Sequence, residues 1–268
     1  MTARAAPSSA ERLRLPSAAA ALRLAGLAAW TALWTAIFGV GRLAGGGMGW
    51  TTGCRRRWSR GLLRILGVRV SVVGPLPEPP YLLAANHLGY LDVLVLAAVL
   101  PVRFVAKSEV RRWPVWGPLA AWTGTLFLDR ARPRDAHRVA SAVERALAEG
   151  GAVLIFAEGT SSPGDTVLPY RPALFEGAIA SGAPVVPAAL GYRIPEEPAL
   201  VRERVCWWGE MEFAPHLLGL AALPPIHGTL ALGTPLSRGD DRKVVAVAAR
   251  DATAALQRTI IQKEGPTC

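Results

Sequence analysis

The feature that most constrains the fold is an alternation, from residue 68 onward, of short apolar runs with segments of helical periodicity. Short apolar runs bounded by turn residues are typical of buried strands, whereas apolar residues at three- and four-residue spacing indicate helices. Strands are expected at 68–74, 81–86, 103–107, 125–130, 152–157 and 184–190, and helices at 91–100, 114–124, 134–149, 172–182 and 240–265. This alternation predicts an α/β fold with a mixed, largely buried sheet and surrounding helices.

A stretch without any charged residue, 24–41, lies between Arg23 and Arg42 and indicates a membrane element near the N-terminus. As a helix it would be about 27 Å long, close to the thickness of a hydrocarbon core. Three interpretations compete. A cleaved signal peptide is disfavoured, because more basic chain follows a poor cleavage site. A transmembrane helix has arginines at both ends and so has no preferred orientation, whereas a hairpin that enters one leaflet avoids that conflict and is favoured.

Composition favours a membrane partner over a nucleic acid. The chain of 268 residues is 51% hydrophobic, carries a net charge of +10 and contains nine tryptophans. A protein that is both apolar and basic suits anionic partners, and abundant tryptophan is typical of a membrane interface. A nucleic-acid binder is the least favoured alternative, since the arginines cluster around the uncharged segment and no basic-aromatic recognition motif is present.

The basic residues concentrate in the first part of the chain. Segment 55–67, which reads "RRRWSRGLLRILG", places Trp58, Leu62, Leu63 and Leu66 at helical spacing among arginines. This pattern predicts a basic amphipathic helix on an anionic membrane, with a surface helix packed on the core as the alternative. We therefore expect a membrane-associated helical region at 1–67 and an α/β domain at 68–268.

The stretch "NHLGYLD", 86–92, follows an expected strand and begins an expected helix. A polar turn would explain Asn86 and Gly89 without any function. However, catalytic groups gather at the carboxyl ends of strands in α/β sheets, and an aspartate that binds one imidazole nitrogen leaves the other free as a base. Residues five apart do not share a helix face, so contact between His87 and Asp92 requires a turn at Gly89, with Asp92 in the first helical turn. No nucleophile motif accompanies the pair, which suits activation of a substrate hydroxyl.

Three further blocks follow "NHLGYLD" in order. Their members are Lys107, Glu109, Pro114, Gly117, Gly124, Phe127, Asp129 and Arg130 in the second block, Phe156, Glu158, Gly159 and Thr160 in the third, and Val186 and Pro187 in the fourth. Together the four blocks, across about residues 60–236, resemble the glycerolipid acyltransferase family, which contains bacterial 1-acylglycerol-3-phosphate acyltransferases.

The resemblance implies roles for individual residues. His87, oriented by Asp92, would take the proton from a lysolipid hydroxyl, which attacks an acyl thioester. Donors near Lys107 would stabilise the oxyanion. The acceptor would be bound by a separate set of residues: Arg130, Glu158, Gly159, Thr160 and Arg171.

Two departures from the family pattern bear on the acceptor. Ala157 stands where the family usually has proline, and Ser161 stands where it commonly has a basic residue that could bind phosphate. The resemblance implies 1-acylglycerol-3-phosphate as the acceptor, but Ser161 weakens that assignment. The flanking sequences 161–175 and 207–220 look more like the branch that includes lyso-ornithine lipid acyltransferases, and a lyso-ornithine lipid is the alternative acceptor.

The remaining expectations concern partners. The acyl donor would be acyl-CoA or acyl carrier protein, and the enzyme would be a monomer at the cytoplasmic face of a membrane, in contact with membrane lipid. No cofactor is expected, and no metal, because Cys54, Cys206 and Cys268 lack metal-ligand spacing. A catalytically silent lipid-binding protein with the same fold is the alternative outside the enzymes.

Overall fold

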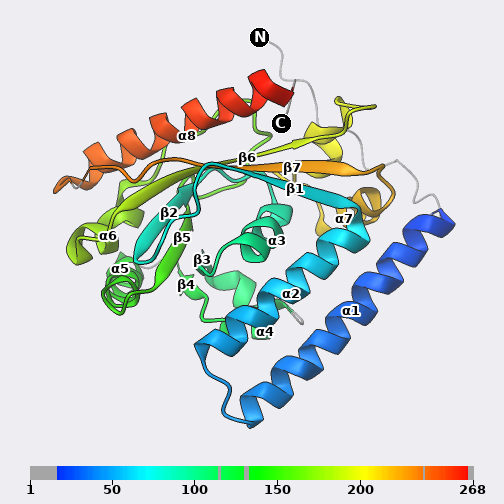
Figure 1. Cartoon of the computed structure of the whole chain (residues 1–268), viewed down its shortest axis with the longest axis horizontal. Coiled ribbons are helices and arrows are strands. Elements are labelled where there is room, and N and C mark those ends of the chain that lie inside the picture. Colours follow the sequence, from blue (N-terminus) through cyan, green and yellow to red (C-terminus); the bar gives the residue numbers. More distant parts are fainter. Residues whose placement is uncertain (1–16, 114–115, 130–132, 238, 265–268) are drawn as a thin grey trace.

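A computed structural model describes residues 17–113, 116–129, 133–237 and 239–264 and contains a seven-stranded sheet (Figure 1). The strand order is β1-β7-β6-β2-β5-β3-β4. The strands are β1 (Val68–Val73), β2 (Tyr81–Ala85), β3 (Arg103–Lys107), β4 (Leu126–Leu128), β5 (Ala152–Phe156), β6 (Val185–Arg193) and β7 (Ile226–Leu232). All neighbours are parallel except β6 and β7, which are antiparallel. The predicted mixed α/β sheet is therefore confirmed.

Helices cover both faces of the sheet, which explains why β2 is buried along its whole length. One face packs against α3 (Tyr90–Val99) and α2 (Met48–Leu66). The other packs against α5 (Pro133–Ala148), α6 (Glu176–Ser181) and α8 (Arg242–Glu264). Figure 1 shows α8 and α3 on opposite sides of the sheet. Apolar side chains that alternate along the strands thus enter two separate cores.

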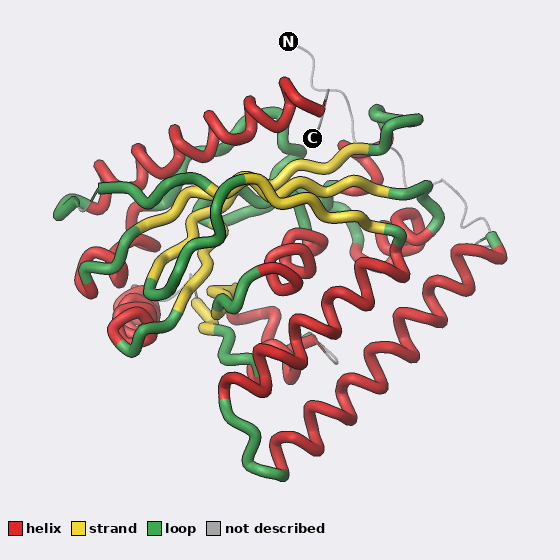
Figure 2. Tube along the Cα trace, viewed as in Figure 1, coloured by secondary structure: helices red, strands yellow, loops and turns green. Residues whose placement is uncertain are grey.

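Two long helices form an antiparallel hairpin whose turn lies far from the sheet (Figures 1 and 2). α1 (Ala18–Leu43) contains the uncharged stretch, and α2 returns to the sheet. Trp30 donates its indole N–H to the Trp58 carbonyl at 3.0 Å, and its ring lies over Gly61, where a Cβ would come within 2.2 Å of it. Arg23 joins the start of α1 to the domain by donating to the carbonyls of Ala221 and Leu223.

The apolar face of α2 is buried in protein, which corrects the prediction that segment 55–67 lays this face on a membrane. Trp58, Leu62, Leu63 and Leu66 are at most 7% exposed and belong to the same core as α3. The alternative, a helix packed on the core, describes this face. The arginines at 56, 57, 60 and 64 are exposed, and Arg56 and Arg60 donate to the Ala98 carbonyl at the end of α3.

Several short elements differ from the sequence-based expectation. The expected helix 172–182 divides into a 3-10 turn, Pro172–Phe175, followed by α6, and α4 covers only Trp116–Trp122. α7 (Phe213–Ala221) and β7 were not expected. β7 contains Gly228 and has a small apolar run, so its pattern is weak; its pairing with β1 and β6 makes it a strand.

Candidate active site

The central contact of the site joins His87 to Asp92. His87 Nδ1 lies 2.8 Å from Asp92 Oδ2, and the histidine side chain is 21% exposed whereas the aspartate is fully buried. Because a carboxylate only accepts hydrogen bonds, Nδ1 is the donor to Asp92, and in the neutral imidazole Nε2 then carries the lone pair. The pair is therefore an oriented base that solvent can reach on one side.

The loop between β2 and α3 folds around the Asp92 carboxylate. Its Oδ2 accepts hydrogen bonds from the backbone N–H groups of Leu88, at 2.6 Å, and Gly89, at 3.0 Å. Asp92 lies in the first turn of α3, as expected, where the helix dipole also favours negative charge. These donors hold a buried carboxylate with which no described lysine or arginine forms an ion pair.

Gly89 is needed for close approach of another segment. A Cβ on Gly89 would lie 2.9 Å from the backbone nitrogen of Trp207, which donates to the Leu88 carbonyl at 2.8 Å. The backbone of Gly89 is extended, so any residue could adopt its φ. Glycine is therefore needed at position 89 for a reason other than its backbone angles, namely that the chain at 206–208 passes directly over the loop.

Asn86 continues the β2–β6 pairing past the end of β2. Its side-chain amide donates to the Leu190 carbonyl at 3.1 Å and accepts from the Leu190 N–H at 2.8 Å. Asn86 is 1% exposed, so both bonds replace hydrogen bonds to water that burial removes. This two-point contact fixes where the loop carrying His87 begins relative to β6.

The block after β5 brings Glu158, Gly159 and Arg171 together. Gly159 has a φ of +74°, and a Cβ there would lie 2.3 Å from Arg171 Nε. Arg171 crosses this glycine and donates from Nε to the Glu158 carbonyl at 3.3 Å. Its side chain is exposed, as is Thr160, so both can meet a ligand. Arg171, predicted from sequence as an acceptor-binding residue, is thereby brought next to the Glu158 block.

The Glu158 carboxyl is buried beneath this surface at 3% exposure. Burial raises the pKa of Glu158 to about 8, and the nearby Asp92 charge adds to the rise, against hydrogen bonds from Leu168, Ser162 and His87. Glu158 is therefore largely protonated at neutral pH. Its side chain supports the loop from inside, and contact with an acceptor would fall to the neighbouring backbone and exposed side chains.

Lys107 ends β3 with an exposed side chain, and β3 and β2 are parallel to the intervening β5. The carboxyl ends of these strands share one edge of the sheet, which is the edge that carries His87 and Glu158. Arg130, the remaining predicted acceptor residue, lies outside the described residues. Among the described residues no group of three His, Cys, Asp or Glu side chains is arranged to hold a metal.

Comparison with known proteins identifies the family. Residues 68–191 match the model of the family described as Acyltransferase. Lyso-ornithine lipid O-acyltransferase of Brucella abortus is 36% identical over 81% of this chain and 87% of its own length. The chain belongs to the acyltransferase family. It is thus an enzyme, and the alternative of a catalytically silent lipid-binding protein is set aside.

Other relatives of this acyltransferase carry a different acceptor in their names. The 1-acyl-sn-glycerol-3-phosphate acyltransferase of Neisseria meningitidis is 41% identical over 50% of this chain and 53% of its own length. The crystal structure of PlsC, the 1-acyl-sn-glycerophosphate acyltransferase of Thermotoga maritima, aligns with a TM-score of 0.50 over 91% of this chain and 98% of that one. At 19% identity this likeness shows the fold alone.

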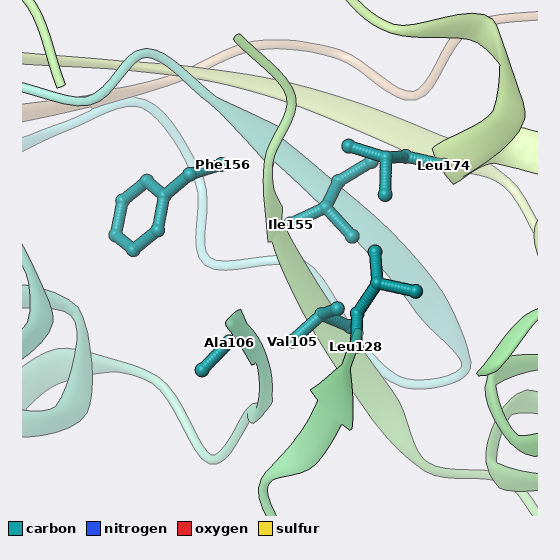
Figure 3. Close-up of a pocket in the computed structure, with 6 residues that line it drawn as sticks. All are labelled: Val105, Ala106, Leu128, Ile155, Phe156 and Leu174. Carbon is teal, nitrogen blue, oxygen red and sulfur yellow. The ribbon is translucent and has the colours of Figure 1, made fainter. Parts of the chain in front are cut away.

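A small apolar pocket lies between the ends of β3, β4 and β5, on the α5 face of the sheet (Figure 3). Phe156 stacks on His87, with ring centroids 3.8 Å apart and planes 16° apart. Figure 3 shows Ile155, Val105, Leu128 and Leu174 pointing toward one another, while Phe156 points to the other face of the sheet, where His87 lies. β3 pairs with β5 only at Phe104 and Arg103 and diverges beyond them, which leaves this apolar space between the strand ends.

Tyr192 also contacts the His87–Asp92 pair of this acyltransferase, although no sequence pattern predicted it. Its hydroxyl donates to Asp92 Oδ1 at 2.7 Å, across a separation of 100 residues. A tyrosine near the end of an apolar strand carries no sequence signal that distinguishes it from an ordinary core residue. Only the pairing of β6 with β2 brings it to the catalytic loop.

Proposed function

We propose that this acyltransferase moves a fatty acyl group from an acyl thioester to the hydroxyl of a lysolipid, with His87 as general base. The observation that carries the proposal is the His87–Asp92 contact, which uses Nδ1 of a partly exposed histidine and leaves Nε2 for a substrate hydroxyl. Nε2 takes the hydroxyl proton as the oxygen attacks the thioester carbonyl. The new ester C–O bond forms, the C–S bond breaks, and the imidazolium returns the proton to the leaving thiolate.

Two groups support the rest of this mechanism. Lys107 lies at the same edge of the sheet as His87 and would stabilise the negative charge that develops on the carbonyl oxygen. The Phe156 ring, stacked on His87, would contact the part of an acyl group nearest the carbonyl. No cofactor enters this scheme, and acyl-CoA or acyl carrier protein serves as the co-substrate.

Two acceptors follow from the relatives, 1-acylglycerol-3-phosphate and a lyso-ornithine lipid. Ser161 supplies no cation where a guanidinium would bind phosphate, and the Brucella abortus relative, which matches 81% of this chain, carries the lyso-ornithine name. These observations support the lyso-ornithine lipid. Arg171, exposed beside Gly159, could bind either a phosphate or the carboxylate of ornithine. Arg130, placed by the family resemblance, would serve the same acceptor.

The helical hairpin would hold the enzyme on one leaflet of the membrane, at the cytoplasmic face where acyl thioesters are made. α1 exposes apolar side chains along its length, among them Leu22, Leu33, Val40 and Leu43. A transmembrane α1 would draw the exposed arginines of the antiparallel α2 into the hydrocarbon, at high cost. Shallow insertion keeps those arginines among anionic headgroups.

One experiment tests the reaction and the acceptor together. The purified enzyme is given one acyl-CoA with 1-acylglycerol-3-phosphate or lyso-ornithine lipid in parallel, and kcat/KM is compared. The His87→Ala variant is expected to lose activity on both acceptors while it still floats with anionic liposomes. Full activity in that variant would exclude His87 as the base. If the wild-type enzyme did not float with the liposomes, the membrane assignment would be excluded.

A further inference from the structure

The Asp92 carboxylate is divided between two sets of donors. His87 and the Leu88 and Gly89 amides all bond to Oδ2, whereas Oδ1 accepts from Tyr192 alone among the residues that the structure describes. Both side chains are buried, Tyr192 at 1% exposure and Asp92 at 0%. Without the tyrosine hydroxyl, Oδ1 would be a charged oxygen with neither water nor donor, which is costly.

The length of β6 brings Tyr192 to this place. β6 has nine residues and pairs with the five-residue β2 up to Ala85 and Ala188. Asn86 then binds Leu190 with both ends of its amide, which extends the parallel alignment past the end of β2. Because side chains alternate along a strand, Tyr192 lies on the same face as Leu190 and points toward α3, where Asp92 begins the helix.

Tyr192 can serve this contact only as a donor. Burial, together with the adjacent Asp92 charge, keeps the pKa of Tyr192 far above its ordinary value, so the hydroxyl stays protonated at any pH at which the enzyme acts. The carboxylate in turn has no proton to give. The hydrogen bond therefore has one fixed direction, and it fixes the rotation of the carboxylate about its own axis.

We propose that Tyr192 is a positioning residue for acyl transfer, which holds Asp92 so that Oδ2 faces His87 Nδ1 throughout the reaction. The proposal rests on the proposed function, in which His87 is the base. Tyr192 also draws part of the carboxylate's charge toward Oδ1, and so limits how strongly Asp92 stabilises the His87 imidazolium. It thus affects both the geometry of the base and its protonation.

Few other ionisable groups face this carboxylate. Glu158, from the loop after β5, feels the charge of Asp92. Tyr90, in the same helical turn as Asp92, is engaged instead with His216 from α7, at 2.9 Å. The His216 ring nitrogen on its other side donates to the Cys206 carbonyl, so Tyr90 must donate to His216. Tyr192 and His87 are therefore the groups whose replacement should alter Asp92 directly.

The test compares two buried tyrosines that differ in their partner. Tyr192→Phe removes the hydroxyl that binds Asp92. Tyr81→Phe removes a buried hydroxyl that has no partner among the described residues. Tyr81 begins β2, whereas the loop that carries His87 follows the other end of this strand. With acyl-CoA and the preferred lysolipid, Tyr192→Phe should lower kcat about 10- to 100-fold and leave acceptor KM within about twofold. Tyr81→Phe should leave both unchanged.

Two readouts separate positioning from a structural role. The acidic limb of the kcat/KM profile should move to higher pH by about half a unit in Tyr192→Phe, because the carboxylate then stabilises the imidazolium more strongly. In the Asp92→Asn background, Tyr192→Phe should cause no further loss, since groups that act as one unit are not additive. An unmoved limb, or a loss that adds to that of Asp92→Asn, would overturn the proposal.

The His87→Ala variant keeps the two proposals distinct. If His87→Ala is inactive while Tyr192→Phe behaves like the wild type, the positioning role fails and the proposed function stands. If His87→Ala is active, the proposed function itself fails. Should Tyr192→Phe not fold, 3-fluorotyrosine at position 192 keeps the ring and strengthens the donor. The acidic limb should then move to lower pH, and an unmoved limb would overturn the role of Tyr192.

Discussion

Phe156 lies flat against His87, with ring centroids 3.8 Å apart and an angle of 16° between the planes. The last residue of β5 thus restricts the imidazole on one face, while Asp92 holds its Nδ1. Stacking and hydrogen bonding together leave the ring little freedom to rotate away from a substrate hydroxyl.

Replacement of this aromatic wall should slow the chemical step. Phe156→Leu keeps an apolar side chain but loses the flat contact, and we expect kcat to fall about 5- to 20-fold. Steady-state kinetics at saturating lysolipid would measure it. Phe104→Leu is the matched control, because Phe104 lies on the same core face of the neighbouring β3 without touching His87. Equal kcat in the Phe156→Leu variant and the wild type would show that the stack does not orient the base.

Protonation of Glu158 should make stability depend on pH in a specific window. An unfolded glutamate ionises near 4.5, whereas burial raises the pKa of folded Glu158 to about 8. The folded state therefore binds the extra proton between these values, so this group's contribution is complete below pH 4.5 and is lost as pH rises through 8. The effect is of order a few kcal/mol.

Glu158→Gln is the variant that isolates this effect. The neutral amide should be more stable than the wild type at pH 8 and nearly equal to it at pH 5. Thermal unfolding of both proteins across this pH range measures the difference in stability between them. The contributions of all other ionisable groups are shared by the two proteins and cancel in this difference. A difference that is constant with pH would mean that the buried carboxyl is already ionised in the folded enzyme.

Gly159 should be needed for the placement of Arg171. Gly159→Ala would put a Cβ 2.3 Å from Arg171 Nε and displace the guanidinium from its position over the Glu158 carbonyl. We expect acceptor KM to rise about tenfold, as in Arg171→Ala, with a smaller change in kcat. Initial rates at varied acceptor concentration measure this.

Gly150 offers the control for the backbone cost alone. It has a φ of +80°, and nothing lies within 4 Å of the Cβ that Gly150→Ala would add. Gly150→Ala should lose about 1 to 2 kcal/mol of stability, because a side chain is strained at positive φ. Gly159→Ala should lose a similar amount for the same reason, but only Gly150→Ala should keep its acceptor KM. Arg171 would have no part in acceptor binding if Gly159→Ala and Gly150→Ala had the same KM.

Gly61 should hold the two helices of the hairpin together. Gly61→Ala would place a Cβ 2.2 Å from the Trp30 ring and force α1 away from α2, at a cost of about 1 to 3 kcal/mol. Gly49→Ala, in the same helix with nothing within 4 Å, should be neutral or slightly stabilising. Urea unfolding in detergent and liposome flotation would compare them, and equal stability of the two variants would contradict the close α1–α2 contact.

Much of the fold follows from local pattern. The helix of α5 repeats apolar residues on one face, and β2 and β5 are short apolar runs between turns, so each could be recognised by itself. The uncharged stretch of α1 was recognisable in the same way. Their bounds agree with prediction to within about two residues, because periodicity and turn residues act over a few neighbours. The exception is α1, which extends well beyond the uncharged stretch at its N-terminal end.

The contact between His87 and Asp92 could also be predicted, because the two residues are five apart and one loop brings them together. Long-range placement could not. β7 became a strand only through its pairing with β1 and β6, and the apolar face of α2, which would suit a membrane by composition, is covered by α3 instead.

What the sequence by itself determined is the chemistry: an α/β chain with an uncharged stretch near the N-terminus, a His–Asp pair and a glutamate-glycine block after a buried strand. What only the tertiary structure decided is how that chemistry is held. Tyr192 reaches Asp92 because β6 continues past the end of β2, and Gly89 is required because the chain at Trp207 crosses the loop. Both are contacts between segments more than 90 residues apart, whose pairing depends on the packing of the whole sheet and on no local preference.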